Sequence, residues 1–308
     1  MSMSVGGQAV LEGVMMRTPS SWSVAVRRAD GEVATLSEPV NSVAARRRWL
    51  RVPVIRGVVA LGESLVIGFR ALAISAGYAA ADEEGESGDD VTAELSRGQL
   101  IFAFAIAIGF TVVVFKVSPA LITNLLPIDS TGIFVVVEGL IRVGLLVGYL
   151  ALISLIPDLR RVFQYHAAEH KAINAYEDGA ELTPEIVQGY SKIHVRCGTA
   201  FLLWVMVIAV FVFALVGRPD WPLLIASRVL LLPVIAGLAY ELIRFGGKHP
   251  QNRIVRALLA PGLWLQSLTT REPTLDQIEV SINALRNALA SEERIQGERG
   301  ASRVEVMA

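Results

Sequence analysis

Long apolar segments limit what this chain can fold into. An α-helix needs about 20 apolar residues to cross roughly 30 Å of hydrocarbon. Apolar residues make up 53% of the chain and the mean hydropathy is +0.51, which favours an integral membrane protein over a soluble enzyme. The predicted fold is therefore mainly α, a polytopic helical membrane protein with about four transmembrane helices. These helices are Leu100–Leu126, Gly132–Ile156, Thr199–Val216 and Leu223–Ile243.

Lysine and arginine predict how these helices are oriented, because short loops rich in these residues stay in the cytoplasm. The predicted loop between the second and third helices contains basic residues from Arg160 to Arg196, and the chain before the first helix is also rich in arginine. The short connections on the other side contain only Arg218. We therefore expect both termini in the cytoplasm, and a single cysteine agrees with that reducing compartment.

A further apolar stretch, Gly57–Ala80, is long enough to span a membrane but contains Glu63 and Arg70. If it crossed, the basic loop described above would face outward, against the positive-inside tendency. We therefore predict an interfacial or re-entrant helix here. A second surface helix is predicted at Gln251–Leu268, where arginines lie beside leucines and a tryptophan, with a break at Pro261-Gly262.

The remaining segments have the composition of soluble structure. Two β-prone runs flank Asp30-Gly31, a two-residue hairpin signal, so a small N-terminal antiparallel β unit is expected. Thr274 can cap a helix that continues to about Leu289 and is followed by a polar tail. The predicted organisation is a cytoplasmic β-containing segment at 1–45, the interfacial or re-entrant helix at 46–81, an acidic linker at 82–97, transmembrane helices at 98–156 and 199–247, a cytoplasmic histidine-containing loop at 157–198, and cytoplasmic amphipathic helices with the polar tail at 248–308.

The strongest chemical signal lies in the predicted cytoplasmic loop. On a helix, His166 and His170 share one face with Cβ atoms about 5–6 Å apart, so both imidazoles can reach one ion. With Glu169 they form an H-x-x-E-H pattern, which in inverted zincins supplies two zinc ligands and a carboxylate that acts as a base on a metal-activated water. The alternative is that these polar residues are solvated, or bind lipid headgroups, without an ion.

Candidates for a third ligand follow downstream. His194 and the only cysteine, Cys197, are about one helical turn apart. We prefer His194, which would complete three protein ligands and leave a position for water, as in catalytic zinc sites. Cys197 is either a further ligand of a closed, structural site or a small buried residue. Glu177 is less suited, because on a straight helix it lies roughly 13 Å from the midpoint of the first two histidines.

Other charged residues are candidates for supporting roles. Glu241, near the cytoplasmic end of the fourth predicted helix, is level with the histidines and is an alternative ligand or a partner of one. Further charges lie inside the predicted transmembrane helices, where they would form one polar layer in the outer half of the bilayer. That layer is either a structural ion-pair network or a site for an anionic lipid phosphate. It consists of Lys116, Glu138, Arg142 and Arg228.

The sequence resembles the YqhQ-like family of bacterial membrane proteins of unknown function over nearly its full length. The resemblance is carried by the blocks Gly6–Arg17, Tyr165–Glu177 and His194–Thr199, and by the shorter strings Tyr240–Phe245 and Pro261–Gln266. Members of that family are described as predicted metal-dependent enzymes. The resemblance therefore implies a metal-binding, multi-pass protein of the bacterial cytoplasmic (inner) membrane.

Together these observations predict a membrane enzyme with a divalent transition metal, preferably zinc, as cofactor. His166, His170 and His194 would hold the ion at the cytoplasmic interface, and Glu169 would be the general base of a hydrolase. Its substrate would be a lipid-linked or membrane-proximal group. The alternative is a non-catalytic protein that binds or moves an anionic lipid or solute through the charged layer. Membrane lipids are expected partners, a homo-oligomer is compatible with the sequence, and a net charge of −1 argues against nucleic acid.

Overall fold

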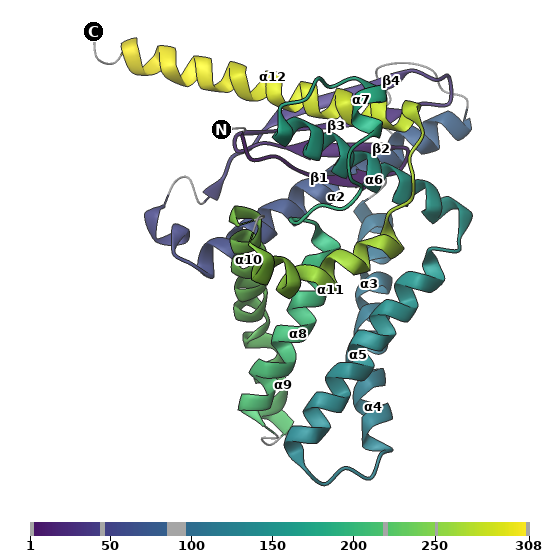
Figure 1. The fold of residues 1–308 in the computed structure, drawn as a ribbon, viewed down its shortest axis with the longest axis vertical. Coiled ribbons are helices and arrows are strands. Elements are labelled where there is room, and N and C mark those ends of the chain that lie inside the picture. Colours follow the sequence, from purple (N-terminus) through teal and green to yellow (C-terminus); the bar gives the residue numbers. More distant parts are fainter. Residues whose placement is uncertain (1–2, 44–46, 85–96, 218–220, 250–251, 306–308) are drawn as a thin grey trace.

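The computed structural model of the protein describes residues 3–43, 47–84, 97–217, 221–249 and 252–305. Figure 1 shows two parts: a head, in which helices cover an antiparallel sheet, and an arm of helices that extends away from it. The first and last elements of the chain both belong to the head. The predicted fold class, a mainly helical membrane protein with a small N-terminal β unit, is confirmed.

The head is built on a four-stranded sheet whose strands lie side by side in sequence order. β3 (Ser21–Arg27) and β4 (Val33–Pro39) form the predicted hairpin. Gly31 in its turn has a φ of +91°, which glycine adopts without strain. β1 (Gly6–Val10) and β2 (Gly13–Arg17) form a second antiparallel hairpin that the sequence pattern does not delineate.

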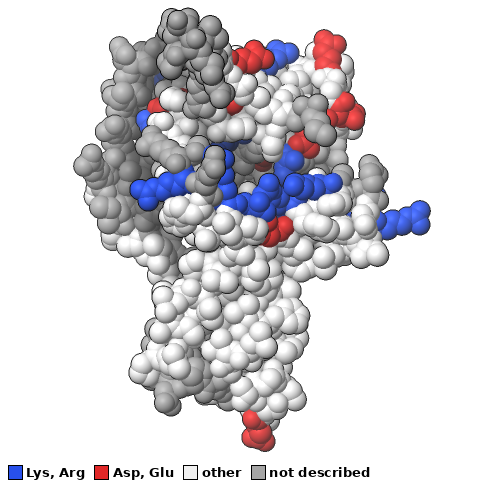
Figure 2. All heavy atoms as spheres, turned by 90° about the vertical axis from the view of Figure 1, so that its left-hand side faces the viewer, with Lys and Arg blue, Asp and Glu red and all other residues white. Residues whose placement is uncertain are grey.

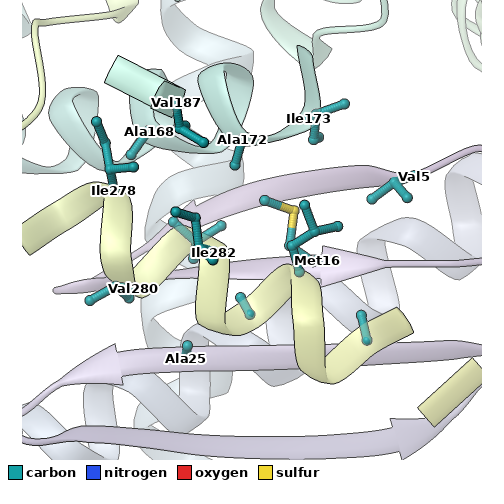
Figure 3. Close-up of a cluster of buried hydrophobic side chains, with 14 of the residues drawn as sticks. Val5, Met16, Ala25, Ala168, Ala172, Ile173, Val187, Ile278, Val280 and Ile282 are labelled. Carbon is teal, nitrogen blue, oxygen red and sulfur yellow. The ribbon is translucent and has the colours of Figure 1, made fainter. Parts of the chain in front are cut away.

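Both faces of the sheet are covered, because alternate residues of a strand point to opposite faces. On one face, Met16 of β2 packs in a cluster with helices α6 (Pro157–Asp178) and α12 (Leu275–Glu305). On the other face, Met15 packs in a cluster with α2 (Ile55–Glu84). Figure 3 shows the first cluster, in which side chains from α6, α12 and the strands converge. The core of the head therefore positions α6, the helix that carries the H-x-x-E-H motif.

Helix α12 begins as predicted but ends later. Thr274 and Gln277 form a reciprocal capping box: the Gln277 side-chain oxygen accepts from the Thr274 amide at 3.0 Å, and the Thr274 hydroxyl accepts from the Gln277 amide at 3.3 Å. The apolar face of the helix is buried, with Ile278 and Leu285 fully enclosed. The helix continues to Glu305, so most of the predicted polar tail is helical.

Helix α2 covers the second face of the sheet and is held there by polar contacts. Arg17 of β2 pairs with Glu63, and Arg28, after β3, pairs with Asp82, both at 2.7 Å. The opposite side of α2 exposes leucine, valine and phenylalanine side chains. Figure 1 shows α2 beneath the sheet, at an angle to the helices of the arm, an arrangement that fits the predicted interfacial helix. The predicted acidic linker, 82–97, lies outside the described residues apart from its ends.

The arm consists of apolar helices. Helix α3 (Arg97–Val112) continues through a π-helical turn, η2 (Val113–Val117), into α4 (Ser118–Asn124). Helices α5 (Thr131–Ile153) and α8 (Gly198–Val216) pack against each other. Figure 2 shows that the visible face of the arm is almost free of charged side chains, whereas Lys and Arg gather in a band where the arm meets the head. This distribution is typical of helices in a bilayer with basic residues at its surface.

The predicted transmembrane helices are confirmed in part. Among the described residues, four stretches are long and apolar enough to cross a membrane, and three of them match the first three predicted helices. The fourth is in α2. The fourth predicted helix, Leu223–Ile243, is divided at Leu231 into α9 (Trp221–Leu230) and α10 (Leu232–Lys248). The division lies just before Pro233, which cannot donate a helical hydrogen bond. The four stretches are Ile55–Asp82, Ala105–Asn124, Thr131–Ile153 and Gly198–Val216.

Helix α11 (Arg253–Thr269) lies across the junction between head and arm (Figure 1). The predicted break at Pro261-Gly262 is wrong, because α11 continues through Pro261. Gly262 allows a close approach to α8: a Cβ at this position would lie 3.1 Å from the Cβ of Ala200. Contact with α8 thus supports the helix where proline removes one of its backbone hydrogen bonds.

Candidate metal centre

Helix α6 presents both histidines of the motif on its buried side. It begins at Pro157, which is favoured in the first turn because its missing N–H would have no partner there. It ends at Asp178, and the following Gly179 closes it with a φ of +76°. The rings of His166 and His170 have centroids 4.4 Å apart. His170 is 1% exposed and Glu169 is 4% exposed, so the centre of the motif is closed to bulk water.

Backbone carbonyl groups fix one ring nitrogen of each histidine. His166 Nδ1 lies 2.9 Å from the carbonyl oxygen of Thr269 in α11, and His170 Nδ1 lies 2.7 Å from that of Lys192. Because a carbonyl oxygen only accepts, each Nδ1 carries a proton, and in the neutral ring Nε2 keeps its lone pair. Metal-binding histidines usually have this arrangement. The two Nε2 atoms lie 4.0 and 3.8 Å from Oε2 of Glu169.

Cys197 joins the two histidines. The ligand atoms of His166, His170 and Cys197 lie within 4.8 Å of one another, and no other group among the described residues meets that condition with three or more such side chains. The sulfur is 3.3 Å from His166 Nε2. Cys197 is the N-cap of α8, and its sulfur accepts from the Thr199 amide at 3.4 Å. The sequence left the role of this cysteine open, and the fold places it in the cluster.

His194, the third ligand preferred from the sequence, lies beside this cluster but faces another partner. Its Nε2 is 3.5 Å from Oε2 of Glu177, and its ring centroid is 5.8 Å from that of His170. Glu177 also forms an ion pair with Arg196. Burial lowers the pKa of His194 despite the hydrogen bond to Glu177, which leaves the imidazole neutral near pH 7. Glu177 therefore contacts His194 rather than the two histidines of α6.

Gln266 of α11 holds the backbone of His194. Its side-chain oxygen accepts from the His194 amide at 3.0 Å, and its side-chain nitrogen donates to the His194 carbonyl at 3.0 Å. Gln266 is fully buried. Since α11 also supplies the carbonyl of Thr269 to His166, this helix fixes two sides of the site. The sequence signal for this role is slight: one glutamine in a largely apolar stretch.

Glu169 lies between the histidines and β1. Burial raises the pKa of Glu169 to about 7, and electrostatic interactions with His166 and Arg196 oppose this shift. A carboxyl group with a pKa near neutrality is suited to proton transfer. Gly7 of β1 packs against it so closely that an added Cβ would lie 2.6 Å from Cγ of Glu169. Gly7 thus brings the first strand directly onto the acid.

Glu241 forms its contacts elsewhere. It makes an ion pair with Arg56 of α2, and its Oε1 accepts from the Val54 amide at 3.4 Å. These contacts join α10 to α2. Within the described part of the chain, no contact links Glu241 to the histidines, so the structure does not bring this candidate into the cluster.

The predicted charged layer is assembled in part. Glu138 and Arg142 form a buried ion pair on α5, and Arg142 Nε donates to the carbonyl of Phe115 at 2.9 Å. Phe115 lies in the π-helical turn η2, where backbone hydrogen bonding departs from that of an α-helix. Lys116, in the same turn, lies 5.7 Å from the centroid of an aromatic ring of α8. The side chain of Arg228 lies outside the described part of the structure.

The fold and the site define a class: a helical membrane protein with an α+β head and a largely buried His–His–Cys cluster beside a carboxyl group. The chain belongs to the family described as "Protein of unknown function (DUF1385)", which matches residues 52–291. It is 34% identical over 294 residues to "Uncharacterized protein YqhQ" of Bacillus subtilis (strain 168), and the match covers 93% of this chain and 92% of the relative. No solved structure matches it. The resemblance seen in the sequence is thereby confirmed.

Proposed function

We propose that this protein is a metal-dependent hydrolase of the cytoplasmic membrane, with the ion held by His166, His170 and Cys197. The observation that carries the proposal is the fixed tautomer of the two histidines. Each donates Nδ1–H to a backbone carbonyl and turns Nε2 into the space shared with the cysteine sulfur. Imidazole nitrogen and thiolate sulfur are ligands that zinc prefers, whereas magnesium and calcium prefer oxygen. The donor set therefore fits zinc or a similar transition metal.

Glu169 is the general base in this proposal. Its Oε2 lies 3.8 Å from His170 Nε2, close to the ligands, yet Glu169 is outside the three-residue ligand group. Three protein ligands with an open position are typical of catalytic zinc sites. When bound, the ion would supply an activated water and a Lewis acid. Glu169 would accept the proton of the attacking water and pass it to the leaving group.

The place of the site in the fold supports a substrate at the membrane surface. Helix α11 supplies the carbonyl that fixes His166 and lies where the arm meets the head (Figure 1). It exposes Ile254 and Trp264, apolar residues suited to an interface. A lipid-linked or membrane-proximal ester or phosphoester could reach the site from that side. The basic band of Figure 2 supports a cytoplasmic head.

A non-catalytic carrier of an anionic lipid or solute is the second candidate. Its support is the buried Glu138 and Arg142 within the arm, because intramembrane charges are costly and often functional. The partners of Arg142 weaken this candidate. Its guanidinium is engaged by Glu138 and by a backbone carbonyl, as expected for a structural pair.

Metal content of detergent-purified protein tests the first proposal. We expect near-stoichiometric zinc, or another transition metal, in the wild type and its loss in His166→Ala and His170→Ala. The matched control is His249→Gln, because His249 contacts Phe245 and is not part of the cluster. Folded wild-type protein that contains no metal and cannot be reloaded would refute the proposal.

Cobalt loading tests the cysteine separately. A thiolate ligand gives cobalt(II) a charge-transfer absorption that histidine ligands do not. We expect this band in the wild type and its loss in Cys197→Ser, with weaker binding retained through the two histidines. If the band is absent from the wild type while His194→Ala removes the metal, His194 is the third ligand instead. Glu169→Gln should keep the metal but abolish hydrolysis of ester and phosphoester lipids.

A further inference from the structure

A pocket of about 320 Å³ lies between the end of α10, the start of α11 and the loop segment 191–195. Its volume is at the lower end of the range for ligand pockets, roughly 300–1,000 Å³. Its apolar lining includes Leu259 and Leu263 of α11. Arg256 of the same helix and His249 also line it, and none of the described residues that line the pocket is acidic. The pocket therefore combines positive charge with an apolar wall.

The two basic residues are placed to receive an anion. His249 Nδ1 donates to the carbonyl of Phe245 at 3.0 Å, and the two rings lie 4.4 Å apart between centroids. Because Nδ1 is engaged, Nε2 is left for a ligand. Arg256 is an exposed residue of α11, and its guanidinium suits the planar, paired hydrogen bonding of a phosphate.

The surroundings of the pocket are those of a membrane surface. Helix α11 lies at the junction of head and arm, the level at which Figure 2 shows a band of Lys and Arg. Its outer side exposes Ile254, Leu258 and Trp264. Basic residues and tryptophan beside exposed apolar residues are the features of a segment at the depth of lipid headgroups. A soluble anion would use the basic residues of the pocket alone, whereas a phospholipid would use the basic and the apolar residues.

The pocket is separate from the candidate metal centre. Ile193 and Val195 line it, whereas His194, between them, is held by Gln266 and faces Glu177. The segment thus forms one wall of the pocket without lending it a metal ligand. A ligand in the pocket would contact the same loop that leads to Cys197.

We propose that this pocket binds the phosphate of an anionic membrane phospholipid, with Arg256 and His249 on the phosphate and Leu259 and Leu263 against the glycerol and the first carbons of an acyl chain. This proposal does not depend on the proposed metal-dependent hydrolase function, because none of the proposed metal ligands lines the pocket. The junction of head and arm would then hold a specific lipid site, in addition to the general attraction that the basic band exerts on anionic lipids.

The test uses the full chain in detergent micelles and a fluorescent phosphatidylglycerol as probe, with phosphatidylcholine for comparison. We expect tighter binding of phosphatidylglycerol, and a loss of about tenfold or more in Arg256→Gln, because a charged hydrogen bond is removed. Arg253→Gln is the matched control: it removes an exposed arginine of the same helix that does not line the pocket, and should change affinity less than about twofold.

A second variant tests the apolar wall without altering charge. Leu263→Trp should fill the pocket and also weaken phosphatidylglycerol binding, while His166→Ala should leave phosphatidylglycerol binding unchanged.

Equal losses in Arg256→Gln and Arg253→Gln would show that only the basic band attracts the lipid, and would overturn the proposal. Displacement of the probe by inorganic phosphate at matching concentrations would overturn it too, because the site would then be one for soluble anions.

Discussion

Gly7 of β1 lies against the carboxyl group of Glu169 in α6, so that a Cβ on this glycine would come within 2.6 Å of Cγ and 2.8 Å of Oε1. This contact joins the first strand of the chain to the acid of the H-x-x-E-H motif. It gives Gly7 a role in the site, since a larger residue would have to displace the proposed general base.

Alanine at Gly7 should therefore disturb Glu169. We expect Gly7→Ala to lower the free energy of unfolding by about 1–3 kcal/mol through overpacking, and to weaken metal binding. Gly6→Ala is the control, because no atom of the described residues lies within 4 Å of a Cβ at that position; its effect should stay within about 0.5 kcal/mol. Thermal unfolding and metal titration of both variants check this. Equal behaviour of the two variants would contradict the close packing of Gly7.

Removal of the Gln266 side chain should loosen the loop that carries His194. Gln266→Ala would leave the His194 amide without its partner, at a cost of about 1–3 kcal/mol for that buried group, and would leave the His194 carbonyl with the Cys197 amide as its donor. Hydrogen exchange of residues 191–197 should become faster, and the metal should dissociate more readily. Ser267→Ala is the comparison, because that exposed hydroxyl donates to a carbonyl of its own helix. Unchanged exchange in Gln266→Ala would show that the loop is held by other contacts.

Acid should weaken the attachment of α12 to the sheet. Glu292 is buried and accepts from the Thr18 hydroxyl at 2.8 Å and the Ser20 amide at 2.7 Å. Burial raises the pKa of this carboxyl, but the hydrogen bonds from Thr18, Gln296 and Ser20 outweigh it and hold the pKa below its usual range.

Because the folded-state pKa is depressed, this stabilisation is complete above the unfolded-state pKa of about 4.5 and is lost as the pH falls through the folded-state value. Glu292→Gln should be less stable than the wild type at pH 7, and its stability should fall less between pH 6 and pH 3. Glu293→Gln, at an exposed neighbour, should follow the wild-type curve. Thermal unfolding as a function of pH measures both slopes, and parallel curves for Glu292→Gln and the wild type would rule out this contribution.

Variants of the ion pair in α5 distinguish a structural role of this pair from a role in transport. Arg142→Met should destabilise the protein by about 3–5 kcal/mol, because it leaves Glu138 buried without its partner. The double variant Glu138→Leu with Arg142→Met should recover most of that loss. Unfolding in detergent measures both. Wild-type stability of Arg142→Met, together with a loss of lipid or solute binding, would instead favour the carrier.

Much of the fold follows from patterns that act within a single element. Three of the apolar stretches, the β3–β4 hairpin and the start of α12 are all local, because helix length, turn residues and capping depend on neighbours in the chain. The division of the chain before Pro233 and the continuity of α11 through Pro261 differ from expectation. A proline can begin a helix, as at Pro233, or lie inside one, as at Pro261 beside α8, and the local sequence does not decide between the two.

The sequence by itself determined that the chain is a helical membrane protein and that His166, Glu169 and His170 share one helix, because apolar length and i,i+4 spacing need no other part of the molecule. Only the tertiary structure decided what joins them. Cys197 enters the cluster, His194 turns to Glu177, and Gly7 closes on Glu169. These contacts connect residues on separate elements, and their choice depends on how α6, α8, α11 and β1 pack, which no local spacing specifies.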